Sequence, residues 1–260
     1  MMINILMFMQ RFKVSEVFFE LSNENRLKIL NILEERGMAL RDFQNNLNIP
    51  KPEIYRHLKR LIESNIVIRD EKNRYQLSPV GKIIMLYLKG LNLLEKYDFV
   101  FRNHDISFLP REFQLSLGDM EGVEVIEGTI EGFNLTVERL KNARSYENIM
   151  TREILLPFIE PVSALVERNA KVRIIAPYST RKDFFKLIEK IRTRDLKIKL
   201  VEKVDLVILV DEKSGEFNLP YLNGDIDYGI TFYIREENGI KWINRLFEYY
   251  WETLPGEFIF

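Results

Sequence analysis

Apolar residues in the first part of the chain recur at helical spacing, in segments separated by polar breaks. The first segment is residues 23–36, NENRLKILNILEER, which offers polar caps at its start and ends at Gly37. The stretch LRDFQNNLN, from Leu40, has the same spacing over a shorter length. Residues 51–64 predict a third helix, in which Pro52 suits the first turn because no N–H is needed there.

The third predicted helix has two different faces. At about 100° per residue, one face is an apolar stripe of Ile54, Leu58, Leu61 and Ile62. The outer face carries Arg56, Lys59 and Arg60, with Lys51 and Tyr55 on its flanks. His57 lies at the edge of the stripe, where we expect it to pack and form a hydrogen bond. A basic face of this kind is either ordinary solvated surface or a surface for a polyanion.

Residues 66–77 decide between these two interpretations. IVIRD, EKN and RYQLS predict two strands joined by a polar tip that carries Lys72 and Arg74. Helix, helix, turn, helix and hairpin follow one another in a winged helix-turn-helix. The major groove of DNA admits one α-helix, whose outward side chains reach base edges and phosphates. The predicted DNA contacts are Lys51, Tyr55, Arg56, Lys59, Arg60, Lys72 and Arg74.

These segments carry a family resemblance. NRLKILNIL followed by IYRHLKRLIESNIV resembles the winged-helix core of ArsR-like and related archaeal transcription regulators. LSPVGK, FRNHDISFLPREFQLSLGDM and the final RLFEYYWE are similar to the archaeal methanogenesis-regulatory (FilR-type) family, which joins this DNA-binding domain to a sensor-like domain. Pro50 and Pro52 stand where such helices carry small hydroxylated residues, so recognition would rest on the cationic side chains.

Two residues of the third helix keep alternative roles. Glu53 either complements the positive end of the helix dipole, which we favour, or accepts a hydrogen bond from a cytosine amino group. Tyr55 either packs on the preceding helix or touches DNA.

Ser78 and Pro79 predict the start of a long helix that reaches about Asn103. It has two apolar stripes and therefore needs two partners. One partner is the winged-helix body. The other is a second subunit, through Ile84, Tyr87, Leu91 and Leu94, or the C-terminal domain. We expect a DNA-binding domain at 1–78, a connecting and dimerisation helix at 79–108, and a regulatory domain at 109–260.

Strand and helix patterns alternate from about Leu109 to the end of the chain. They predict an α/β domain with a largely parallel core. This part resembles the sensor domains of the TrmB type, which have a phospholipase-D-like fold. Hydrolases of that fold depend on paired H-x-K motifs, whereas the single match here, at His57, lies in the predicted DNA-reading helix. The resemblance therefore does not imply hydrolysis.

Composition narrows the function further. The chain has two histidines and no cysteine. The lack of cysteine excludes disulfides and thiol chemistry and suits the cytoplasm. It contains no glycine-rich phosphate-binding motif, its apolar runs are too short to span a membrane, and no cofactor is expected. The apolar start, MMINILMFMQRFKV, is interpreted as a docking arm or a helix start. Asp211, Asp225 and Asp227 suggest solvated turns rather than a metal site.

Charge is distributed unevenly along the chain. Residues up to Asp105 hold 17 Lys+Arg against 13 Asp+Glu, whereas the remainder holds 21 against 26. A basic N-terminal part and an acidic C-terminal part indicate different partners for each.

Residues at two predicted strand ends suggest a binding site for a small anionic metabolite. They are Thr151, Arg152, Tyr178, Ser179, Thr180 and Arg181. The alternative is helix capping by the hydroxyls and solvent-facing arginines.

The sequence thus predicts a homodimeric transcription regulator that is not an enzyme. It would bind a palindromic operator in double-stranded DNA through helix 51–64 and the wing at 66–77, with a ligand-responsive C-terminal domain. The alternatives are a protein-interaction module whose winged helix does not bind DNA, and a phospholipase-D-like hydrolase.

Overall fold

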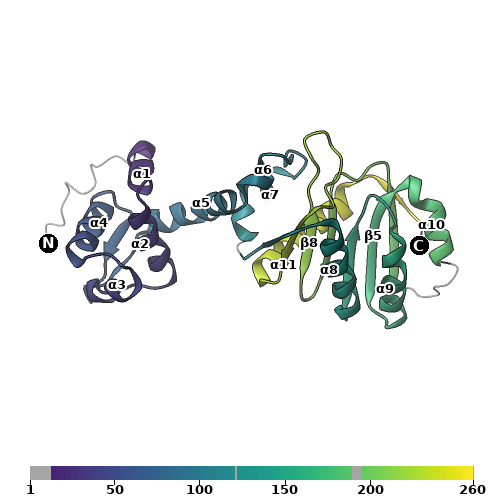
Figure 1. The fold of residues 1–260 in the computed structure, drawn as a ribbon, viewed down its shortest axis with the longest axis horizontal. Helices are drawn as coiled ribbons and strands as arrows, with labels where there is room; N and C mark the ends of the chain where they lie inside the picture. The colour runs from purple at the N-terminus through teal and green to yellow at the C-terminus, as the bar shows by residue number, and fades with distance from the viewer. Residues whose placement is uncertain (1–12, 121, 189–194, 260) are drawn as a thin grey trace. The chain divides into compact units, whose positions relative to one another are not determined.

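A computed structural model describes residues 13–120, 122–188 and 195–259 (Figure 1). The chain divides into two compact units, residues 1–88 and 89–260. The apolar start of the sequence lies largely outside the described residues. In the described part of the chain, no helix is both long and apolar enough to cross a membrane.

The N-terminal unit contains the predicted helices and hairpin, preceded by a helix that begins at Val14, the last residue of the apolar start. Its elements are α1 (Val14–Leu21), α2 (Glu24–Glu35), α3 (Leu40–Asn46), α4 (Lys51–Glu63), β1 (Val67–Arg69) and β2 (Tyr75–Leu77). Asn23 caps α2 by accepting a hydrogen bond from the Arg26 N–H at 3.1 Å. Asn65, in the turn after α4, takes the left-handed conformation (φ 56°), which asparagine tolerates.

The wing is attached to the body of this unit. β1 and β2 pair antiparallel, and Tyr75 also exchanges backbone hydrogen bonds with Met38 at 2.8 Å in both directions. The Tyr75 ring meets Phe43 of α3 edge to face, with ring centroids 6.1 Å apart. These contacts hold the hairpin at a fixed place beside α3 and α4.

The predicted long helix is shorter than expected. α5 (Pro79–Lys96) ends before Tyr97, which leaves the helical conformation (φ −123°, ψ 32°), and a short helix α6 (Asp98–Phe101) follows. The buried residues of α5 belong to two cores. Ile84, Met85 and Leu88 join the N-terminal core, and Leu93 joins the C-terminal core.

The assignment of Ile84 to a dimer contact was wrong, because this side chain is 8% exposed and packs inside its own unit. The apolar residues of α5 that are exposed are Ile83, Leu86, Tyr87, Leu91 and Leu94.

The C-terminal unit is an eight-stranded sheet with helices on both faces (Figure 1). Its strands are β3 (Glu124–Glu127), β4 (Tyr146–Met150), β5 (Lys171–Pro177), β6 (Leu196–Val201), β7 (Val207–Asp211), β8 (Gly215–Asn218), β9 (Ile230–Ile234) and β10 (Gly256–Phe258). Its helices are α7 (Arg111–Leu115), η2 (Leu117–Met120), α8 (Thr129–Asn142), α9 (Leu156–Glu167), η3 (Tyr178–Thr180), α10 (Arg181–Ile188) and α11 (Glu237–Thr253).

The expectation of a largely parallel core was wrong. The strand order is β10-β6-β5-β4-β7-β8-β9-β3, and only the pairs β4–β5 and β5–β6 are parallel. A tight turn joins β7 to β8, with Ser214 N–H donating to the Asp211 carboxylate at 2.9 Å, so these strands must run antiparallel.

Each face of the sheet has its own core. α8, α9 and α10 cover one face through residues that include Leu140, Leu165 and Phe184. α11 and α7 cover the other face through Trp242, Phe247 and Phe113.

Candidate nucleic-acid interface

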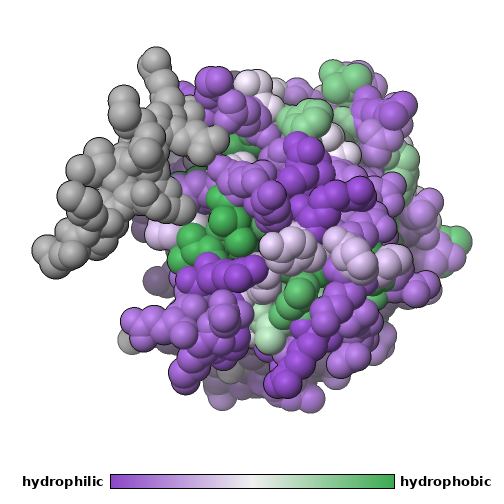
Figure 2. All heavy atoms as spheres, turned by 90° about the vertical axis from the view of Figure 1, so that its left-hand side faces the viewer, coloured by the Kyte–Doolittle hydropathy of each residue, from purple (hydrophilic) through white to green (hydrophobic). Residues whose placement is uncertain are grey.

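Helix α4 is anchored on one side and open on the other. Ile54, Leu58 and Leu61 are fully buried. Tyr55 is 49% exposed, and Arg56 and Lys59 expose 69% and 65% of their side chains. Tyr55 is therefore not covered by the preceding helix. The N-terminal unit is mainly hydrophilic on the face turned toward the viewer in Figure 2, with hydrophobic residues in small patches.

The outward cations of α4 are held only loosely. Arg56 lies 3.7 Å from Glu53, and Lys59 lies 3.8 Å from Glu63, in both cases within one helical turn. Exposed pairs of this kind contribute about 0.3–0.5 kcal/mol. A phosphate group can displace such partners at little cost.

Arg60 is placed differently from its neighbours. Its guanidinium donates two hydrogen bonds to the Glu20 carboxylate of α1, at 3.1 and 2.7 Å, and stacks over Phe19 at 5.1 Å. These hydrogen bonds and the charge of Glu20 raise the pKa of Arg60. Glu20 is buried and also pairs with Arg26 at 3.2 Å. Arg60 thus ties α4 to α1, a contact that the sequence did not reveal.

The tip of the wing is shaped by Asp70. Its carboxylate accepts hydrogen bonds from the N–H groups of Lys72 and Arg74 at 2.9 and 2.8 Å, and from the Arg74 side chain at 2.9 Å. The backbone bond from Arg74 is the main reason that the pKa of Asp70 is lowered. Asn73 takes the left-handed conformation (φ 64°) in this turn. Lys72 and Arg74 are exposed at the tip.

Glu53 and His57 form a contact at the start of α4. His57 is 4% exposed and lies 3.3 Å from the Glu53 carboxylate, which confirms its expected packing role. Glu53 also accepts a hydrogen bond from the Asn25 amide at 3.4 Å. It lies in the first turn of the helix, where a carboxylate is favourable.

Residues 23–69 match the model of the family "Bacterial regulatory protein, arsR family". The chain carries the DNA-binding domain of a transcription regulator. A search of the curated proteins finds no match.

Among solved structures, the chain is similar to TrmBL2, described as an archaeal chromatin protein with a novel mode of DNA binding. The identity is 17% over 90% of this chain and 94% of that one, with a TM-score of 0.45. It is also similar to Nuc from Salmonella typhimurium, a phospholipase D family member, at 9% identity over 52% of this chain and 97% of that one, with a TM-score of 0.41. The IclR regulator from Alicyclobacillus acidocaldarius gives 10% identity over 92% and 96%, with a TM-score of 0.28.

The residues predicted to bind an anion do not gather in one cavity. Arg152 donates to the Gly224 carbonyl at 3.2 Å, and Arg181 pairs with Glu257 at 2.6 Å. Thr180 is buried and bonds the Pro177 carbonyl, whereas Tyr178 and Ser179 are exposed. Thr151 lines a cavity, but its hydroxyl donates to the Glu153 carbonyl at 2.7 Å. Both arginines therefore already have partners within the chain.

The C-terminal unit instead contains a buried charge cluster. Arg139 of α8 donates to Glu147 of β4 at 2.9 Å, lies 3.1 Å from Asp211 of β7, and donates to the Ser214 hydroxyl at 3.0 Å. Glu216 of β8 is a third carboxylate near this guanidinium. All five residues are at most 4% exposed. Burial raises the pKa of Glu147 to about 8 and raises that of Glu216.

Sequence reasoning missed this cluster, although a signal for it exists. Arg139 follows Gly132 and Thr136 at helical spacing and precedes Leu140, so it falls on the face of α8 that is buried. A charged residue on a buried face implies buried partners. The strand β8 that supplies Glu216 was not predicted, so the sequence could not show that Glu216 lies near Arg139.

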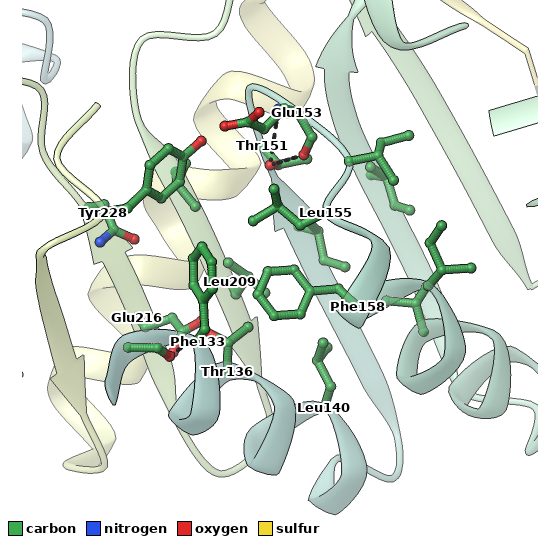
Figure 3. A pocket seen from close by; sticks show the side chains of 18 of the residues that line it. Phe133, Thr136, Leu140, Thr151, Glu153, Leu155, Phe158, Leu209, Glu216 and Tyr228 are labelled. Atoms are coloured by element: carbon green, nitrogen blue, oxygen red, sulfur yellow. Dashed lines mark hydrogen bonds between the residues drawn. The ribbon is translucent and has the colours of Figure 1, made fainter. Parts of the chain in front are cut away.

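A cavity lies beside the cluster, between α8, α9 and the sheet (Figure 3). Its volume is about 70 Å³. Apolar side chains dominate its lining, among them Phe133, Leu140, Phe158 and Leu209. Its polar lining includes Thr136 and Glu216 at one end and Thr151, Glu153 and Tyr228 at the other (Figure 3).

Proposed function

We propose that the protein is a homodimeric transcription regulator that binds double-stranded DNA through α4 and the wing. The observation that carries this proposal is the set of exposed, loosely paired cations on α4, within a unit that matches the arsR-family model. Arg56 and Lys59 project away from a fully buried stripe, as a helix in the major groove requires.

The contacts fall into three groups. Arg56, Lys59 and Tyr55 are the groove contacts, and Lys51 at the start of α4 contacts the phosphate backbone. Lys72 and Arg74 add backbone contacts from the wing. Arg60 acts mainly by holding α4 against α1, because its guanidinium is bound to Glu20.

The exposed apolar side chains of α5 support dimerisation. Tyr87, Leu91 and Leu94 are 69%, 49% and 37% exposed and follow one another at helical spacing. A symmetric pair of such helices would place two α4 helices on successive half-sites of a palindrome. Tyr87→Glu with Leu91→Glu should therefore give a monomer in analytical ultracentrifugation. A variant that sediments like the parent would exclude this interface.

The C-terminal unit is proposed as a regulatory domain without enzymatic activity, and the protein as one that acts on DNA in the cytoplasm. For a ligand to change DNA occupancy, it must bind the DNA-competent and incompetent states with different affinity.

The test of DNA binding is selection from a library of random duplexes. We expect one palindromic sequence to be enriched, and Arg56→Ala with Lys59→Ala to reduce affinity for it by about tenfold to a hundredfold. The matched control is Lys241→Ala with Arg245→Ala, which removes one exposed lysine and one exposed arginine from α11. Failure to enrich any sequence, together with unchanged duplex binding by the Arg56 and Lys59 variant, would favour a protein-interaction module.

A further inference from the structure

We propose that the cavity between α8, α9 and the sheet binds a small primary amine with a short apolar body. The ammonium group would bind Glu216, and the hydrocarbon would lie among the aromatic and aliphatic side chains. This site is separate from the DNA interface and its existence does not depend on DNA binding.

Glu216 supplies an acceptor that the protein leaves open. Its Oε1 is hydrogen-bonded to the Thr136 hydroxyl at 2.7 Å. Its Oε2 is buried and has no hydrogen-bond partner within the described part of the chain. The residue is 1% exposed, and a buried polar atom without a partner costs free energy. A donor from a ligand in the cavity would satisfy this oxygen.

The charges around Glu216 favour a cationic donor. Arg139 stands near three buried carboxylates, those of Glu147, Asp211 and Glu216. Burial raises the pKa of Glu216, because it disfavours the ionised carboxylate. An ammonium group at Oε2 would stabilise the ionised form of Glu216. An anionic ligand would destabilise that form further, so the cavity is unsuited to the anionic metabolite that the sequence suggested.

The rest of the cavity suits hydrocarbon. Phe133 meets Phe158 and Tyr228 edge to face, with centroids 5.6 and 6.2 Å apart, and Leu140 and Leu209 complete the wall near the sheet. The ring faces can also attract an ammonium group. An apolar cavity of about 150 Å³ holds benzene, so this cavity of about 70 Å³ accommodates about three carbon atoms.

Isothermal titration of the full chain with three isosteric probes tests the site. The probes are propylamine, the neutral propan-1-ol and the anionic propanoate, which have the same chain length. We expect saturable binding of the amine, at least about tenfold weaker binding of the alcohol, and no binding of the acid. No binding of the amine, or equal binding of amine and alcohol, would overturn the proposal.

Two variants locate the binding. Glu216→Gln should weaken amine binding at least about tenfold, whereas Glu138→Gln, which removes the same charge from the exposed side of α8, should leave it unchanged. Leu155→Trp should abolish binding, because it fills the cavity while keeping Glu216. This variant tests the location of the site even if the Glu216 variant does not fold. Unchanged binding in either cavity variant would contradict this location. Because no DNA is present, a negative result leaves the DNA-binding proposal intact.

Discussion

The two units place their charges in opposite ways. In the N-terminal unit, Arg56 and Lys59 project from an apolar core and have only weak partners at the surface. In the C-terminal unit, Arg139 is buried together with Glu147 and Asp211 beneath α8. A surface cation contributes little to stability and stays available for a polyanion. A buried cation is tied to its partners, and removing it leaves carboxylates that nothing compensates.

The largest effect expected from this contrast is on stability. Arg139→Ala should lower the free energy of unfolding of the C-terminal unit by about 3–5 kcal/mol, because it leaves buried carboxylates without a positive partner. Denaturant unfolding can be followed by tryptophan fluorescence, since both tryptophans, Trp242 and Trp251, lie in this unit. Arg56→Ala is the control and should change that free energy by less than about 0.5 kcal/mol. Equal stability of the two variants would contradict the difference drawn here between a buried and an exposed arginine.

A smaller effect concerns pH. Burial raises the pKa of Glu147 from its ordinary value of 4.5 to about 8, so the folded protein holds this proton more tightly than the unfolded chain. The resulting stabilisation is complete below pH 4.5 and is lost as the pH rises through about 8. Glu147→Gln should remove this loss of stability with rising pH. If the parent and the variant lose stability in parallel between pH 5 and pH 8, Glu147 is ionised when folded, contrary to its raised pKa.

The smallest effect distinguishes two arginines on the same helix. Arg60→Ala should weaken duplex binding by no more than about threefold, because its guanidinium is held by Glu20 rather than free for phosphate. Arg56→Ala should cost more, at about tenfold. Fluorescence anisotropy with the selected duplex measures both. A larger loss for Arg60→Ala than for Arg56→Ala would show that the Glu20 contact opens on DNA.

The difference between the units also explains what the sequence could predict. Local spacing predicted α2, α3, α4 and the wing, because these segments have amphipathic patterns and are separated by breaks such as Gly37. In the C-terminal unit, the sequence predicted alternating strands and helices but not the order of the strands. Strand order depends on contacts between distant segments, such as β4 with β7.

The same limit applied to single residues. Exposure of Arg56 and Lys59 follows from their position on one helix. The partner of Arg60 lies on α1, forty residues away, and nothing in the sequence near Arg60 indicates it. Ile84 was misassigned because α5 has apolar residues on more than one side, and only packing shows which of them are covered.

The salt dependence of duplex binding tests the central claim most directly. Affinity for the selected duplex is measured across a range of salt concentrations for the parent chain and for Arg56→Ala with Lys59→Ala. If these exposed cations neutralise phosphates, log affinity falls linearly with log salt, and the double variant has a slope shallower by roughly 1 for each phosphate contact removed. An unchanged slope in the double variant would contradict the assignment of α4 as the DNA-binding helix.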